Sequence, residues 1–295
     1  EGKTRVWNIA DSKLWYLESE QAQGFLDLEN AEDYKKTITD KEIDLINKNL
    51  PSVLSSLPHK EYNVVDLGCG DGKKASLFIK GFHNNLNIRY CPVDISGYMV
   101  QKAISTIKSL KDIPIIELNW NISDFDNLPN LTTILSGDYY KHNFLLLLGN
   151  TFCNFEGEDI LSSVRSSMKT GDFLLIGNSL LLGDLESSLK PYKEERISSL
   201  FLFKMIKQLG FSEDEVTYGA RYKNGRIELC YTLLKDKIIE HNGKKVYFEK
   251  GDLIVVAYSY RYTLEELKNI IVPTFSKTQF FVSEDKSYCL ALCSL

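Results

Sequence analysis

The sequence predicts an α/β protein with a doubly wound, mostly parallel sheet of the Rossmann type. Short apolar runs alternate with helix-like segments between about residues 60 and 180. The apolar runs are almost continuous, as expected for strands that helices cover on both faces. One run ends in a turn, residues 68–72, with a glycine at every second position. Such a turn brings backbone amides close to a ligand, and the alternation favours parallel strands joined by helices.

The elements of this predicted core follow one another in a regular order. Five apolar runs predict the parallel strands: 64–67, 88–93, 115–118, 144–148 and 173–176. Helices are expected at 74–81 and 98–110, after the first two strands. Near the C-terminus, the apolar runs 279–282 and 288–292 flank a polar turn and predict a hairpin. We therefore expect a seven-stranded sheet that ends in an antiparallel hairpin.

Residues 196–263 form a separate block in this interpretation. A helix at 197–209 precedes strand-like segments at 226–233, 244–249 and 253–262. Three turn signals punctuate the block: Asn224-Gly225, Asn242-Gly243 and Lys250-Gly251. We predict that this block is an α+β substrate-binding insertion within a cofactor-binding core of residues 61–195 plus 264–295.

Residues 1–60 are predicted to form an N-terminal helical segment that packs with the substrate domain. Thr39 and Glu42 have the spacing of a capping box, which predicts a helix that begins there. An apolar stripe with helical spacing follows: Ile43, Ile46, Leu50, Val53, Leu54 and Leu57.

Composition and charge limit the classes of partner. A net charge of −5 and a pI of about 5.6 argue against a protein that binds nucleic acid or a membrane surface. The longest apolar runs, such as 144–148, are too short to span a bilayer, and no secretory signal is visible. The six cysteines are scattered, as expected for buried free thiols, and the histidines lack zinc-site spacing. We expect a cytoplasmic monomer that binds no metal, nucleic acid or membrane.

The glycine spacing narrows the choice of cofactor. A dinucleotide fingerprint wants a third glycine three residues after the second, and here that position is Lys73. This counts against an NAD-dependent oxidoreductase. The tighter G-x-G-x-G form after Asp66 resembles motif I of Rossmann-type S-adenosylmethionine (SAM) methyltransferases. An ordinary strand-to-helix turn is the alternative interpretation of this stretch alone.

Further features sit where SAM would need them, at the ends of consecutive predicted strands. Asp94 ends the second strand, and its carboxylate can accept hydrogen bonds from ribose hydroxyls. Asp124 offers an acceptor for the adenine amino group, with the Phe125 ring beside the base. Gly149 follows the fourth strand, where sulfonium and substrate would meet. The predicted cofactor-binding residues are Asp66, Gly68, Gly70, Lys74, Asp94, Ile95, Asp124, Phe125 and Gly149.

Specific strings resemble the histidine-specific SAM methyltransferase family, which includes an ergothioneine-pathway enzyme that trimethylates histidine. Residues 90–96 resemble its "PVDVS" segment, and residues 148–155 resemble its "LGSTIGNF" motif. Residues 169–177 are similar to "PGDxLLLG", while 226–229 and 259–263 are similar to "RIEM" and "SYKYT". The resemblance runs from about residue 30 to the C-terminus.

The resemblance implies a set of substrate-binding residues. Asn154 matches the asparagine that holds the amino-acid substrate near its amino and carboxylate groups, and Tyr34 matches a tyrosine beside the reacting amine. Tyr192 matches a tyrosine that helps to bind the substrate carboxylate. Ser259 and Leu229 match residues that line the pocket for the substrate side chain.

One departure from the family affects substrate choice. The family's histidine-selecting glutamate lies two positions before the serine, and this chain has Ala257 there. The sequence therefore predicts a SAM-dependent N-methyltransferase that acts on the amine of a small amino acid or related amine, with Tyr34 and Asn154 as the catalytic residues. The alternative is a catalytically inactive SAM-binding protein that uses the insertion to bind a partner.

Overall fold

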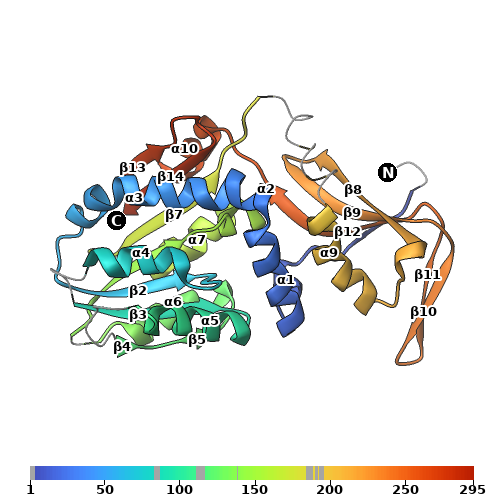
Figure 1. Ribbon diagram of the computed structural model, residues 1–295, viewed down its shortest axis with the longest axis horizontal. Coiled ribbons are helices and arrows are strands. Elements are labelled where there is room, and N and C mark those ends of the chain that lie inside the picture. The colour runs from blue at the N-terminus through green and yellow to red at the C-terminus, as the bar shows by residue number, and fades with distance from the viewer. Residues whose placement is uncertain are drawn as a thin grey trace. The chain divides into compact units, whose positions relative to one another are not determined.

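The computed structural model describes residues 4–82, 87–110, 117–137, 139–183, 189, 192 and 196–295. The chain divides into two compact units (Figure 1). The first comprises Glu1–Leu28 with Leu182–Arg261, and the second comprises Glu29–Leu181 with Tyr262–Leu295. The division into residues 1–60, 61–195 plus 264–295, and 196–263 stays our proposal for the functional domains.

A mixed sheet forms the centre of the second unit. Its strands lie in the order β13-β14-β7-β6-β2-β3-β4, with β5 also paired to β3. Their bounds are β2 Glu61–Leu67, β3 Asn87–Asp94, β4 Glu117–Leu118, β5 Asn121–Ile122, β6 His142–Leu147, β7 Phe173–Ser179, β13 Lys277–Val282 and β14 Tyr288–Ser294. The strands from β2 to β7 pair in parallel, and the β13–β14 hairpin adds antiparallel strands at one side. The predicted doubly wound sheet and terminal hairpin are confirmed.

The third predicted strand differs from its expected form. Residues 115 and 116 lie outside the described residues, and the segment that follows forms two short strands, β4 and β5, beside β3. Among the described residues, the sheet therefore has eight strands rather than seven. The break between β4 and β5 lets the chain follow the edge of the sheet to the end of β3, where Asp94 pairs with Ile122.

Helices cover both faces of this sheet (Figure 1). Helices α3 (Asp40–Ser55), α4 (Lys73–Phe82) and α5 (Gly97–Lys108) contribute to one apolar core with alternate residues of β2, β6 and β14. Helices α6 (Leu128–Leu135) and α7 (Gly157–Ser167) pack together on the other face, and α10 (Leu264–Ile271) contacts α7. The apolar stripe predicted for α3 is confirmed, since Ile46, Val53 and Leu57 are buried in this core.

The predicted capping box is wrong. Thr39 has helical backbone angles and its side chain caps no helix end, because the π-helical turn η2 (Lys35–Thr39) leads directly into α3. A capping box needs an extended residue at the helix start, and none exists here. The Glu42 side chain is therefore free to turn inward, and it is fully buried.

The first unit is built on a smaller mixed sheet. Its order is β1-β12-β9-β8, with bounds β1 Val6–Asn8, β8 Val216–Lys223, β9 Arg226–Leu233 and β12 Leu253–Tyr260. Strands β12, β9 and β8 pair antiparallel, and β1 pairs in parallel with β12. A separate hairpin joins β10 (Lys237–His241) to β11 (Lys244–Phe248). The Asn-Gly pairs at 224–225 and 242–243 have positive φ at both residues, which is the turn geometry that such hairpins need.

The remaining helices of the first unit include α9 (Arg196–Gln208) and the short η1 (Ser12–Trp15). Helix α1 (Ser19–Asn30) and helix α2 (Glu32–Tyr34) carry the chain from the first unit into the second. The sequence prediction missed β1, β8 and β10. Of these, β8 alternates weakly and β10 is mostly exposed, so neither has the continuous apolar run by which the core strands were recognised.

All six cysteines are buried free thiols, as predicted. In the part of the chain that the structure describes, no helix has the length and apolar character needed to cross a membrane.

Gly72 supports a close approach between α4 and α5. Its φ is +75°, and a Cβ added there would lie 2.9 Å from the backbone Cα of Ala103 in α5. Gly72→Ala should lower the free energy of unfolding by about 2–3 kcal/mol, because backbone strain and overpacking act together. Urea denaturation measures this.

Gly70→Ala is the matched control, because Gly70 has a φ of +52° but no atom within 4 Å of an added Cβ. It carries the backbone strain without the steric clash. Equal loss of stability in the two variants would contradict the packing role of Gly72.

Candidate active site

The turn after β2 has the geometry that the glycine spacing predicts. Gly68, Gly70 and Gly72 all have positive φ, of 68°, 52° and 75°. The Gly68 amide donates to the carbonyl of Val93 at 2.8 Å, which ties the turn to the end of β3. The backbone at Gly70 faces open space, since an added Cβ would meet nothing within 4 Å. This exposed stretch of backbone can accommodate a ligand.

A second turn lies against the first, where β6 ends. Gly149 and Asn150 both have positive φ, of 70° and 61°, and the short helix η4 (Thr151–Asn154) follows. An added Cβ at Gly68 would lie 3.1 Å from the Thr151 hydroxyl oxygen, so the two turns are in contact. Strands β2 and β6 are neighbours, and the chain continues from them toward opposite sides of the sheet. Ligands of open α/β sheets bind at this kind of switch point.

Asp94 lies at the edge of the glycine turn, as the sequence predicts. Its Oδ1 accepts the amide of Ser96 at 2.9 Å, and its Oδ2 accepts the amide of Gly70 at a long 3.4 Å. Burial raises the pKa of Asp94 to about 6, although these backbone hydrogen bonds oppose the shift. The weakly held Oδ2 is the oxygen that a ribose hydroxyl can engage with least cost.

Asp66 lies one residue before the end of β2. Its carboxylate is buried, and Oδ2 accepts the Tyr90 hydroxyl at 2.7 Å. Burial raises its pKa to about 7. The structure therefore gives this predicted residue a partner within the protein, beneath the turn. Tyr90 was not among the predicted site residues, since nothing in an apolar strand distinguishes it from a core tyrosine.

Asp124 and Phe125 follow β5, next to the end of β3. The amide of Ser123 donates to the carbonyl of Asp94 at 3.0 Å, which fixes this segment beside the glycine turn. Asp124 and Phe125 are half-buried, and the rings of Phe125 and Phe155 lie 5.4 Å apart. Ile95 is also half-buried beside Asp94. The structure thus gathers the predicted ribose and adenine contacts at one end of β3 and β5.

Lys74 is engaged by two acidic side chains of the protein. Its ammonium group pairs with Glu29, and it lies 3.8 Å from Oε2 of Glu42. An added Cβ at Gly149 would come within 2.9 Å of this ammonium nitrogen, so Lys74 lies directly against the second turn. These two carboxylates raise the pKa of Lys74, which burial alone would lower. Lys74 therefore stays charged.

The predicted substrate residues divide between the two units. Tyr34 ends α2 and Asn154 ends η4, and both are half-buried in the second unit. In the first unit, the Tyr192 hydroxyl lies 3.2 Å from the hydroxyl of Ser259. Leu229 is buried and pairs across the sheet with Ala257. Among these predicted residues, the structure thus brings Tyr192 and Ser259 into contact.

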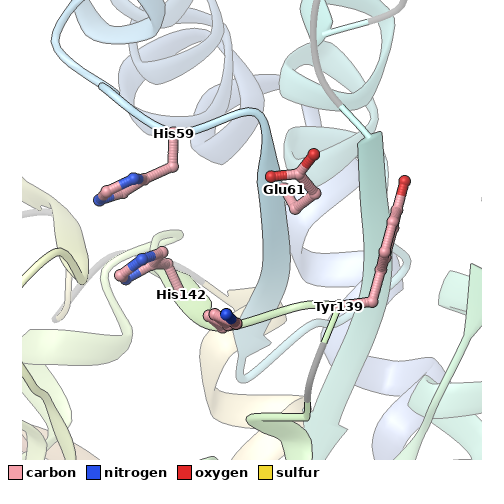
Figure 2. Close-up of a pocket in the computed structure, with 5 residues that line it drawn as sticks. His59, Glu61, Tyr139 and His142 are labelled. Atoms are coloured by element: carbon pink, nitrogen blue, oxygen red, sulfur yellow. The ribbon is translucent and has the colours of Figure 1, made fainter.

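A separate pocket of about 320 Å³ lies at the amino ends of β2 and β6 (Figure 2). It is lined by His59, Glu61, Tyr139, Lys141 and His142. Figure 2 shows the imidazole rings of His59 and His142 one above the other, and their centroids are 3.7 Å apart. The pocket is at the opposite end of these strands from the glycine turn. Among the described residues, no three His, Cys, Asp or Glu side chains gather so that they could hold a metal ion.

Comparison with known proteins agrees with the cofactor class that these two turns suggest. Residues 13–295 match the model of the family described as "Histidine-specific methyltransferase, SAM-dependent". The chain belongs to this family of SAM-dependent methyltransferases. No curated protein matches the sequence.

Solved structures with low sequence identity are also similar. A SAM-dependent methyltransferase from Clostridium acetobutylicum has 12% identity and a TM-score of 0.47, covering 92% of this chain and 98% of its own. A protein from Pyrococcus horikoshii has 13% identity and a TM-score of 0.48, covering 93% and 98%. Human N-acetylserotonin methyltransferase in complex with SAM has 13% identity and a TM-score of 0.42, covering 94% and 56%.

The raised pKa values of Asp66 and Asp94 predict a pH-dependent stability of the ligand-free protein. In the unfolded chain an aspartate titrates near 3.9, whereas in the folded protein these pKa values are about 7 and about 6. Between these limits the folded state binds more protons, so the free energy of unfolding falls as the pH rises. Asp66→Asn removes one of these titrations.

Chemical denaturation at a series of pH values measures the difference in stability between wild type and each variant. The stability of wild type relative to Asp66→Asn should fall as the pH rises from about 4 to about 7. The stability of wild type relative to Asp94→Asn should fall in the same way but reach a constant value near pH 6. A difference that stays flat across this range would contradict the burial of these carboxylates.

Proposed function

We propose that this protein transfers a methyl group from SAM to the amine of a small amino acid or a related amine. The observation that carries the proposal is the position of Asn154, at the end of η4, immediately after the turn at the switch point between β2 and β6. A residue there borders both the cofactor crevice and the space beyond the strand ends. The match to a SAM-dependent methyltransferase family supports the same reaction class.

The residues around the glycine turn suit a nucleoside cofactor. Asp94 would hold the ribose hydroxyls, and Asp124 would accept from the adenine amino group with Phe125 beside the base. The open backbone at Gly70 leaves room for the cofactor to approach the turn. When bound, SAM supplies an activated methyl group on a positively charged sulfur.

The substrate residues would orient the amine and shield it from water. Asn154 would hold the amino-acid end of the substrate. The Tyr34 hydroxyl would accept a hydrogen bond from the amine, so that the lone pair of the amine nitrogen points to the methyl group. The amine must be neutral when it attacks, and its proton would leave through Tyr34 Oη or solvent. Alignment of this kind provides much of the rate enhancement in methyl transfer.

The family resemblance implies three contacts for the side chain of the substrate. Tyr192, Ser259 and Leu229 are our proposed contacts, and the hydrogen-bonding distance between the Tyr192 and Ser259 hydroxyls supports a shared role. The position two residues before Ser259 is Ala257, which offers no carboxylate to an imidazole. We therefore propose the reacting group of the substrate, an amine, and do not assign its side chain.

A tritiated methyl-transfer screen across amino acids and biogenic amines tests the reaction. We expect product from at least one such amine. If the folded protein binds SAM but methylates none of them, the proposed reaction is wrong.

Asn154→Ala tests the role of the asparagine. Loss of a hydrogen bond to a charged substrate group costs about 1.5–3 kcal/mol, so the KM for the amine should rise by roughly 10- to 100-fold. The Kd for SAM, measured by calorimetry, should change less than about twofold because the cofactor contacts remain. Asn130→Ala, on the exposed face of α6, is the control. Parallel losses of SAM and amine affinity would show that Asn154 does not select the substrate.

A further inference from the structure

Glu42 is a fully buried carboxylate at the switch point of the sheet. It comes from α3, and its relative exposure is 0%. Both of its oxygens accept the backbone amide of Gly149, at 2.9 and 3.1 Å. A core position on an amphipathic helix normally holds an apolar residue, because burying a charge is unfavourable unless it is paired. The acceptance of a turn amide from another element sets Glu42 apart from an ordinary core residue.

The surrounding elements leave room for this carboxylate. A Cβ at Gly177, in β7, would collide with Oε1 of Glu42. A Cβ at Gly149 would press on the ammonium group of Lys74. Glycine at both positions therefore leaves space for the side chains of Glu42 and Lys74 beside the Gly149–Asn150 turn.

Lys74 lies beside Glu42, with its ammonium nitrogen 3.8 Å from Oε2. Burial raises the pKa of Glu42, while Lys74 and the Gly149 amide lower it. Lys74 is shared with Glu29, so one cation links two carboxylates. Tyr288 and Tyr34 also contribute to the electrostatic environment of this group. The cluster is connected to both the N-terminal helices and the start of α4.

We propose that Glu42 is a positioning residue for methyl transfer, which fixes the Gly149–Asn150 turn through the Gly149 amide. Two successive residues in left-handed conformation are unfavourable by themselves, and the second is not a glycine. The turn leads directly into η4, whose last residue is Asn154. Glu42 thus controls where η4 begins. The inference rests on the proposed function, because it assumes that this turn borders the reacting groups.

Two variants distinguish the role of the hydrogen bond between Glu42 and the Gly149 amide from that of the ionisable carboxyl group. Glu42→Gln keeps a carbonyl oxygen that can accept the Gly149 amide, whereas Glu42→Leu removes the acceptor and leaves that amide without its partner. Displacement of reacting groups by about 1 Å can cost 10²-fold in rate. We expect kcat to fall about 100-fold in Glu42→Leu and to stay within about tenfold of wild type in Glu42→Gln. The KM for the amine should change less than kcat in both.

Asp172, just before β7, provides a matched control at the opposite end of β6 from the Gly149 turn. It is a fully buried carboxylate that accepts the backbone amide of Asn143 at 2.7 Å, near the start of β6. About 20 Å of strand separates it from the Gly149 turn. Asp172→Asn and Asp172→Leu should destabilise the fold in the same way, by changing the buried acceptor of a backbone amide. Under conditions in which all variants are folded, the kcat of both should stay within about threefold of wild type.

Amide hydrogen exchange of the ligand-free protein gives a readout that does not require turnover. The Gly149 amide should be protected in wild type and in Glu42→Gln, and it should exchange at least tenfold faster in Glu42→Leu, relative to the core amides of β6. Protection of this amide in wild type can be measured even if Glu42→Leu does not fold.

Each outcome decides the proposal. A wild-type Gly149 amide that exchanges as fast as exposed amides would overturn it. So would a kcat in Glu42→Leu no lower than in Asp172→Leu, or a Glu42→Gln variant as impaired as Glu42→Leu. If wild type methylates no amine, the proposed function fails, and the exchange data with SAM affinity still test whether Glu42 holds the turn.

Discussion

The meeting of the turns after β2 and β6 is the constraint on which the site depends. A doubly wound sheet has one point where the chain leaves neighbouring strands toward opposite sides, and no helix can cover the crevice there. The two turns approach closely here, because a Cβ added at Gly68 would lie 3.1 Å from the Thr151 hydroxyl oxygen. Asp94 ends β3, Asp124 follows β5, and Asn154 ends the short helix η4 after the second turn.

Two buried carboxyl groups next to the turns, those of Asp66 and Glu42, are the second feature of the site. Asp66 accepts the Tyr90 hydroxyl just before the first turn, and Glu42, beside Lys74, accepts the Gly149 amide of the second. Both carboxylates are removed from water and their pKa values are raised, so each needs the specific partner that it has. Turns with positive φ would otherwise adopt several conformations. The Gly68 amide donates to the carbonyl of Val93 and the Gly149 amide donates to Glu42, and these two hydrogen bonds limit that freedom.

Much of the core was predictable because its signals are local. Apolar runs identify strands that are covered on both faces, and the positive φ values at Gly68, Gly70 and Gly72 follow from the glycine spacing. Short strands such as β4 and β5 carry too few residues for any periodicity, and they exist only because β3 is beside them. The same is true of β1, whose three residues pair with β12 from the far end of the chain.

The sequence alone determined the fold class, the cofactor turn and the candidate residues at the strand ends, because each depends on neighbouring positions in the chain. It could not determine the role of Glu42. The spacing of Thr39 and Glu42 is that of a capping box, and only the tertiary structure turns the side chain inward to Gly149, 107 residues away. It likewise directs Asp66 to Tyr90. Long-range hydrogen bonds between buried groups leave no periodic pattern in a sequence, so only the tertiary structure showed that Glu42 and Asp66 have buried partners within the protein.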